Sequence, residues 1–245
     1  MTLRLANRVA VVTGASRGIG RTAALGLAAA GAHVVAIART PGGLEELDDE
    51  IGAAGGTATL VPLDLKDYDG IDRLGAALFE RWGRLDILFA NAAILGLVTP
   101  LAHLDAKVWD EAVAVNVTAN WRLIRSLDPL LRASDAGRVL FMSSSAANTC
   151  RPYWGTYSIT KAALDALAAT YAGEVRQTKL CVNVFYPGPT RTRMRAQAMP
   201  GEDPETVKPP ETLLPDIVRM LSPDFADSGT VFDFRTGRSE PLVAP

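Results

Sequence analysis

Short apolar runs alternate with segments of helical periodicity from the N-terminus to about residue 190. The strand candidates are residues 9–12, 33–37, 59–63, 85–90, 139–142 and 182–185. Runs that are apolar throughout are typical of strands buried on both faces of a sheet. Between them, apolar residues recur at helical spacing, as at Ile71, Leu74, Leu78 and Trp82. The alternation predicts an α/β protein with a doubly wound parallel β-sheet and helices on both faces.

Length and charge narrow the possible functions. A chain of 245 residues suits one compact unit, so we expect residues 1–245 to form a single domain. The 25 basic and 27 acidic residues leave a net charge of −2, which argues against nucleic-acid binding. No apolar run approaches the ~20 residues of a membrane span, and two cysteines are too few for a disulfide scaffold. We expect a cytoplasmic protein without nucleic-acid or membrane partners.

A glycine-rich turn follows the first strand candidate directly, with the sequence Thr13-Gly14-Ala15-Ser16-Arg17-Gly18-Ile19-Gly20. Its glycines allow a tight turn, a close approach of backbone N–H groups to a pyrophosphate, and close packing of the next helix on the strand. A strand before the turn and a helix after it favour this function over an ordinary turn. The sheet is therefore predicted to be a single Rossmann-type domain that binds a dinucleotide.

The end of the second strand candidate bears on the choice of cofactor. An acidic residue about 20 positions past the glycines would hold the ribose 2′-hydroxyl of NAD, but Ala38 stands there and Arg39 follows. Arg39 together with Arg17 would form a charge-assisted cradle for a 2′-phosphate. We expect NADP(H) rather than NAD(H), unless both arginines are ordinary surface charges.

Tyr157 and Lys161 are four residues apart, so on a helix both project from one face. A neighbouring ammonium favours the ionised form of a tyrosine and makes it a usable proton donor or acceptor. Ser144 lies just beyond the strand candidate at 139–142, where its hydroxyl could orient a substrate oxygen. These three residues form the candidate catalytic group.

Together with Asn91-Ala92-Ala93 and Asn116, these motifs resemble, in order, those of the classical short-chain dehydrogenase/reductase family over about residues 5 to 235. The resemblance implies four catalytic residues. Tyr157 would be the general acid/base, and Lys161 would lower its pKa and bind the nicotinamide ribose. Ser144 would hold the substrate oxygen, and Asn116 would anchor a water of a proton relay.

The same resemblance implies a set of cofactor-binding residues. They are Gly14, Ser16, Arg17, Gly18, Ile19, Gly20, Arg39, Asp64, Leu65, Asn91, Tyr157, Lys161, Pro187, Gly188, Thr190 and Thr192. For Asp64 a simple helix cap is an equally good interpretation. The family also implies a homo-oligomer, dimer or tetramer, although the altered motif at residues 228–234 puts the tetramer contacts in doubt. We expect residues 230–234 to form an edge strand of the sheet.

Eight of the 15 prolines lie between Pro187 and Pro223. Proline fixes φ and removes a backbone donor, so this stretch is predicted to be irregular with short helices, and residues 188–215 to be a substrate loop. Arg191, Arg193 and Arg195 in this stretch would meet an anionic substrate or form a solvated basic cluster. Trp154 is either a wall of the substrate pocket or a packing residue.

These features favour an NADP(H)-dependent enzyme that transfers a hydride between nicotinamide and the carbonyl or secondary alcohol group of a small molecule. The alternative is a dinucleotide-sensing regulator with the same fold and no turnover. No metal site is expected, because His33 and His103 lack ligand partners at suitable spacing. The sequence does not choose among carbonyl substrates.

Overall fold

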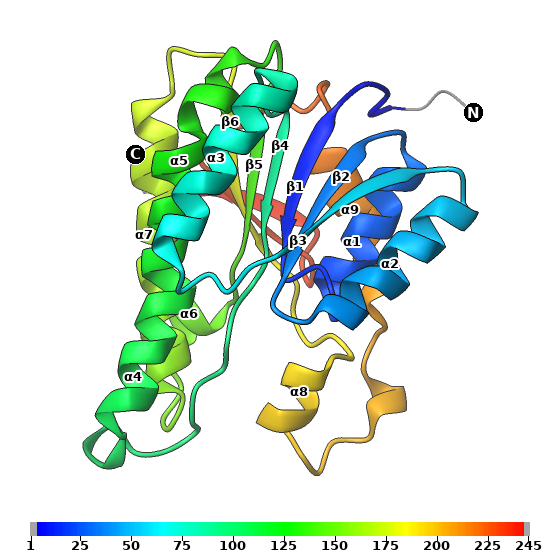
Figure 1. The fold of residues 1–245 in the computed structure, drawn as a ribbon. Helices are drawn as coiled ribbons and strands as arrows, with labels where there is room; N and C mark the ends of the chain where they lie inside the picture. The colour runs from blue at the N-terminus through cyan, green and yellow to red at the C-terminus, as the bar shows by residue number, and fades with distance from the viewer. Residues whose placement is uncertain (1–3, 243–245) are drawn as a thin grey trace.

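The computed structural model describes residues 4–242, and its centre is an eight-stranded sheet with the order β3-β2-β1-β4-β5-β6-β7-β8 (Figure 1). The strands are β1 (Val9–Thr13), β2 (His33–Ala38), β3 (Thr57–Pro62), β4 (Ile87–Ala90), β5 (Arg138–Met142), β6 (Cys181–Tyr186), β7 (Thr230–Asp233) and β8 (Arg238–Pro241). The first seven pair in parallel and β8 is antiparallel to β7. The doubly wound parallel sheet predicted from the sequence is confirmed.

Two layers of helices cover the sheet, as Figure 1 shows. One face carries α1 (Gly18–Ala29), α2 (Pro41–Ala53) and α9 (Leu214–Met220), and the other carries α3 (Tyr68–Trp82), α5 (Ala119–Ala133) and α7 (Gly155–Glu174). Shorter helices complete the chain: 3-10 turns at Leu101–His103, Pro204–Thr206 and Pro210–Leu213, α4 (Ala106–Val113), a π-helical turn at Ala114–Thr118, α6 (Ala146–Thr149) and α8 (Arg193–Ala198). None of the helices within residues 4–242 is both long and apolar enough to cross a membrane.

The two cores follow from the alternation of side chains along each strand. Val9 and Val11 of β1 are buried against α3 and α5, whereas Ala10 and Val12 are buried against α1 and α2. Successive side chains of a strand point to opposite faces, so a strand covered on both sides must be apolar at every position. This explains why the strands read as continuous apolar runs.

Each predicted strand up to residue 185 is present, with its ends shifted by at most two residues. The prediction that residues 230–234 lie at the edge of the sheet was wrong, because β7 pairs with β6 on one side and with β8 on the other. A turn in which the N–H of Gly237 donates to the Asp233 carbonyl at 2.9 Å reverses the chain into β8. All four residues of β8 are exposed, so no apolar pattern marks this strand.

Candidate functional site

A cavity of about 860 Å³ lies at the carboxyl ends of the parallel strands. The residues that follow five strands line it: Gly14 after β1, Arg39 after β2, Asn91 after β4, Ser143 after β5 and Pro187 after β6. The strand order reverses between β1 and β4, and open α/β sheets bind ligands at such a reversal. The volume is in the upper part of the range for small-molecule and cofactor pockets, roughly 300–1,000 Å³.

The glycine-rich turn has the shape that a pyrophosphate requires. Gly14 and Gly18 have φ angles of +68° and +54°, a left-handed conformation that favours glycine. A Cβ on Gly20 would lie 2.3 Å from the Gly14 carbonyl oxygen, so only glycine lets α1 pack this closely on the turn. Ser16 and Ile19 also line the cavity. The turn is thus a cradle that side chains would fill, and it fits a dinucleotide at the N-terminus of α1.

Asn91 fixes the ends of β1 and β4 to each other. Its Nδ2 donates to the Thr13 carbonyl at 3.0 Å. The Thr13 hydroxyl in turn accepts from the backbone N–H groups of Asn91 and Ala92, each at 3.0 Å. The switch point between the two strands is therefore held by side-chain hydrogen bonds as well as by the sheet.

The part of the cavity beside the glycine-rich turn carries the positive charges expected for binding a 2′-phosphate. Arg17 and Arg39 line the cavity and are exposed, and neither forms an ion pair with any residue in the range 4–242. Ala38 is buried at the position where an acidic residue would hold the ribose 2′-hydroxyl of NAD. Asp64 lines the same cavity together with Leu65.

The interpretation of Asp64 as a helix cap was wrong. The N-cap of α3 is Asp67, which accepts from the N–H of Gly70 at 2.9 Å. Asp64 is four residues before the first residue of α3, and it instead accepts from the N–H of Lys66 at 3.0 Å. Its other carboxylate oxygen is 3.9 Å from the ammonium of Lys66.

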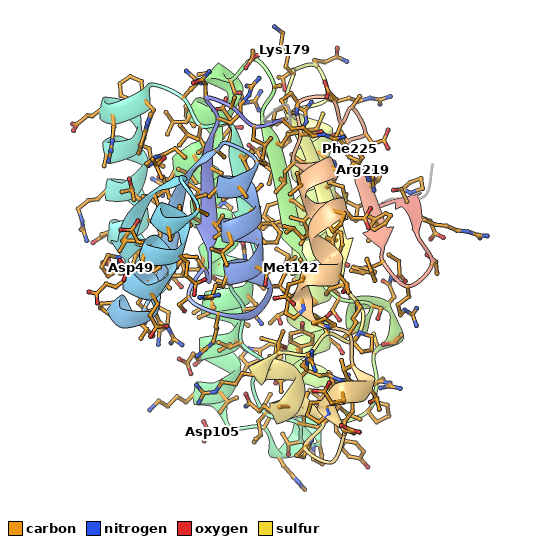
Figure 2. The ribbon with its side chains drawn as sticks, turned by 90° about the vertical axis from the view of Figure 1, so that its right-hand side faces the viewer. Asp49, Asp105, Met142, Lys179, Arg219 and Phe225 are labelled. Carbon is orange, nitrogen blue, oxygen red and sulfur yellow. The ribbon has the colours of Figure 1, made fainter. Side chains whose placement is uncertain are left out.

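Ser144, Tyr157 and Lys161 come together in the cavity from β5 and α7. Lys161 is buried, and its Nζ donates to the carbonyl of Met142 at 2.7 Å and lies 5.7 Å from the centre of the Tyr157 ring. Met142, labelled in Figure 2, is the last residue of β5. The carboxyl end of this strand thus holds the lysine of α7 and presents Ser144 beside the phenol.

Burial sets the pKa values of this group. It raises the pKa of Tyr157 to about 12, and the Ser144 hydroxyl opposes this only in part. Burial lowers the pKa of Lys161 to about 8, although the Asp165 carboxylate raises it. Desolvation of the phenol thus dominates its pKa, and the expected lowering of that pKa by Lys161 stays a prediction. At neutral pH Tyr157 is protonated, which is the form that donates a proton.

Asn116 lies behind this group rather than in the cavity. It is fully buried in the π-helical turn, where its Oδ1 accepts from the N–H of Ile94 at 2.9 Å. Its Nδ2 donates to the Ile94 carbonyl at 2.9 Å and to the Thr160 hydroxyl at 3.0 Å. Both side-chain N–H groups are thus occupied, and Asn116 connects the loop after β4 to the residue before Lys161. A relay water on Asn116 stays a prediction.

The segment from Pro187 to Thr192 lines the cavity as the resemblance implied. Gly188 has a φ angle of +65°, and the Thr190 hydroxyl donates to its carbonyl at 3.1 Å. Lys208 fixes this segment by hydrogen bonds. Its Nζ donates to the carbonyl of Pro187 at 2.7 Å and to the Thr190 hydroxyl at 3.2 Å. Lys208 was not predicted, because no motif distinguishes it within the proline-rich stretch.

The proline-rich stretch forms α8 and two 3-10 turns beside the carboxyl ends of the strands (Figure 1). Its arginines are partly neutralised. Arg195 binds Glu202 through two contacts of 2.5 Å. Arg191 contacts Glu205 at 2.5 Å. The irregular character predicted for this stretch is confirmed, and its assignment as a substrate loop stays a prediction.

Trp154 lines the cavity and also packs on the reactive phenol. Its ring meets that of Tyr157 edge to face, with 6.2 Å between centroids. His33, by contrast, makes hydrogen bonds of 2.8 Å with the hydroxyls of Thr57 and Thr59. Residues 4–242 contain no group of three or more His, Cys, Asp or Glu side chains arranged to hold a metal ion.

Known proteins share this sequence and fold. The family model described as short chain dehydrogenase matches residues 8–203. The oxidoreductase YciK of Escherichia coli K12 is 36% identical over 96% of this chain and 94% of its own length. An NAD-dependent oxidoreductase of Mycobacterium tuberculosis is 36% identical over 78% of this chain and 74% of its own.

A solved short chain dehydrogenase of Shigella flexneri, in complex with NADP, superposes with a TM-score of 0.92. It is 35% identical and matches 95% of this chain and 99% of its own. The family model covers most of the chain, and the relatives match this chain over most of their length. The chain belongs to the short-chain dehydrogenase/reductase family of nucleotide-dependent oxidoreductases.

Proposed function

We propose that the chain reduces a carbonyl compound, or oxidises the corresponding secondary alcohol, with NADP(H), and that Tyr157 is its general acid/base. One observation carries this proposal: Ser144, Tyr157 and Lys161 line the same cavity as the glycine-rich turn. A site that binds a dinucleotide and presents a protonated phenol beside a serine hydroxyl has the parts that carbonyl reduction needs. The expected homo-oligomer and cytoplasmic location stay predictions.

The residues divide the proton chemistry among them. NADPH supplies the hydride for the carbonyl carbon when it is bound. Ser144 and Tyr157 hold the carbonyl oxygen by hydrogen bonds, and Tyr157 gives its phenolic proton to that oxygen. The ammonium of Lys161 then stabilises the phenolate until solvent returns a proton. Asn116 acts through its position, because it ties the loop after β4 to the turn of α7 that carries Lys161.

The preference for NADP(H) rests on Arg17 and Arg39. Both guanidinium groups line the cavity without a carboxylate partner in residues 4–242, and Ala38 offers no acceptor to a ribose hydroxyl. Arginine suits a phosphate because its fork of donors matches the phosphate oxygens. The Shigella relative was solved with NADP, whereas the mycobacterial relative is named for NAD.

A regulator that only senses the dinucleotide remains the alternative. The buried lysine and the serine beside the phenol count against it, because a sensor has no need of a group that moves protons. A buried polar atom that makes no hydrogen bond also lowers the stability of the fold, by about 1–3 kcal/mol. Such atoms are therefore expected where a reaction uses them.

The test is NADPH oxidation against a panel of aldehydes and ketones, with Tyr157→Phe. Removing the phenolic hydroxyl should lower kcat/KM by about 10²–10⁴-fold, the usual contribution of a general acid. The melting temperature should change little. Tyr153→Phe is the matched control. This tyrosine is exposed in the loop just before α7 and does not line the cavity, so the activity of this variant should be unchanged. Undiminished activity of Tyr157→Phe would remove this residue from the mechanism, and tight NADPH binding without turnover of any substrate would favour the sensor.

A further inference from the structure

The charge of the cavity differs sharply from that of the whole chain. Eight arginines and Lys161 line it, against two acidic residues, Asp64 and Glu211. The whole chain, by contrast, holds 25 basic and 27 acidic residues. A cavity lined by one sign of charge concentrates ligands of the opposite sign. The phosphates of a bound cofactor would account for part of this positive charge. An arginine that neither they nor a carboxylate neutralises is available to the substrate.

Four of the eight arginines are neutralised by carboxylates. The ion pairs are Arg21–Glu50, Arg191–Glu205, Arg195–Glu202 and Arg235–Asp233. Among residues 4–242, the cavity arginines without an ion pair are Arg17, Arg39, Arg151 and Arg193. These four guanidinium groups combine an open charge with a position on the cavity, so they are the cations available to an anionic ligand there.

Three of the four belong to the dinucleotide end. Arg17 is part of the glycine-rich turn, and Arg39 follows β2 beside it. Arg193 follows Thr192, whose methyl group would be 3.3 Å from a Cβ on Gly18. These three residues therefore belong to segments beside the turn, where the phosphates of a dinucleotide are expected. Arg151 stands apart from the turn.

Arg151 belongs to the loop between α6 and α7, between Ser144 and Tyr157 in the chain. Its carbonyl accepts from the N–H of Trp154 at 3.1 Å, and the Trp154 ring packs on the Tyr157 ring. Arg151 is exposed and lines the cavity. The loop thus combines a cation with the tryptophan that packs on the phenol ring, three residues further along the chain.

We propose that the substrate carries an anionic group, a carboxylate or a phosphate, and that Arg151 binds it while Trp154 packs on the apolar part. This inference rests on the proposed function, since it assigns a substrate class to the same site. Arginine makes paired, charge-assisted hydrogen bonds to both groups. A lysine at this position would keep the positive charge but would not make the paired hydrogen bonds.

The test uses matched carbonyl compounds that differ in one charge. The pairs are acetoacetate with ethyl acetoacetate, 4-formylbenzoate with its methyl ester, and dihydroxyacetone phosphate with dihydroxyacetone. NADPH is kept saturating. Arg151→Gln should lower kcat/KM for the preferred anionic class by about tenfold or more, equivalent to 1.4 kcal/mol, and leave the neutral partner within about twofold. For the anionic compound, the kcat/KM of Arg151→Lys should lie between that of the wild type and that of Arg151→Gln. The first two pairs against the third separate carboxylate from phosphate.

The control is Arg176→Gln, an exposed arginine outside this cavity, which should leave every pair unchanged. Binding provides a second readout that does not need turnover: with NADP⁺ present, the preferred anion should raise the melting temperature of the wild type and not of Arg151→Gln.

The outcomes separate the two proposals. Reduction of neutral compounds with no preference for anions, or an equal loss for both members of a pair, overturns the anionic substrate and leaves the proposed function intact. No reduction of any compound, with an anion-dependent shift that needs Arg151, supports the anion site and overturns the proposed function. If no compound is reduced and no anion raises the melting temperature, both proposals are overturned.

Discussion

The buried charged side chains at the two ends of the parallel sheet differ in how many hydrogen-bond partners they have. Lys179, just before β6, and Met142, the last residue of β5, are labelled at these two ends in Figure 2. At the amino end, Asp86 is fully buried and its oxygens are satisfied. They accept from the N–H of Val9 at 2.8 Å, from the Ser134 hydroxyl at 2.6 Å and from Arg8 at 3.1 Å.

The carboxyl end leaves polar groups open. Lys161 is just as buried, but its Nζ makes a single hydrogen bond, to Met142. In the first turn of α7, which also carries Lys161, the hydroxyls of Thr156 and Ser158 are buried without a partner in the described part of the chain. A closed polar network stabilises a fold, whereas open buried groups cost free energy and are found at functional sites. The comparison assigns stability to the amino end and chemistry to the carboxyl end.

The largest expected effect on stability tests the amino end. Asp86→Ala leaves Arg8, Ser134 and the Val9 N–H without their shared acceptor, so the free energy of unfolding should fall by about 3–5 kcal/mol. Urea denaturation measures this loss. Activity per folded molecule should be unchanged, because Asp86 does not line the cavity.

Asp135→Ala is the matched control, since Asp135 pairs with the same Arg8 from an exposed position. Its loss should be much smaller, because solvent screens an exposed pair. Similar losses in the two variants would mean that burial does not distinguish the two carboxylates.

The next effect concerns the pH dependence of stability at the carboxyl end. The pKa of Lys161 is about 8 in the folded chain and 10.5 as its ordinary value. Between these values the unfolded chain binds more protons, so this group makes the free energy of unfolding rise with pH, by about 2 kcal/mol from pH 8 to 9.5.

The measurement is urea denaturation of wild type and Lys161→Met across that range. The stability of the wild type relative to the variant should increase with pH, and exposed Lys179→Met should show no such trend relative to the wild type. A constant difference between wild type and Lys161→Met would show that Lys161 keeps its ordinary pKa in the fold.

The smallest effect tests the open charges of the cavity. Arg39→Gln removes one of the two cations assigned to the 2′-phosphate, and should weaken NADPH binding about tenfold, or 1.4 kcal/mol. NADH lacks that phosphate, so its affinity should be unchanged. Calorimetric titration with both nucleotides measures the two affinities. A parallel loss for NADPH and NADH would place Arg39 elsewhere on the nucleotide.

Much of the fold and of the cavity lining was predictable from local pattern. Strands buried on both faces must be apolar throughout, and the glycines at 14, 18 and 20 stand where a side chain would be strained or would clash. β8 was not predictable, because an exposed antiparallel edge needs no apolar pattern. Nor was Lys208, whose hydrogen bonds to Pro187 and Thr190 bring together segments 18 or more residues apart.

By itself the sequence determined six strands of the parallel sheet, the position of the glycine-rich turn and which residues are candidates for the proton chemistry, since each depends on residue type at a fixed local spacing. Tertiary structure alone decided their electrostatics. It buried Tyr157 enough to raise its pKa, turned Asn116 away from the cavity, and paired some arginines while leaving Arg151 without a carboxylate within residues 4–242. Burial and ion pairing depend on what other segments bring near a side chain, and spacing along the chain does not encode that.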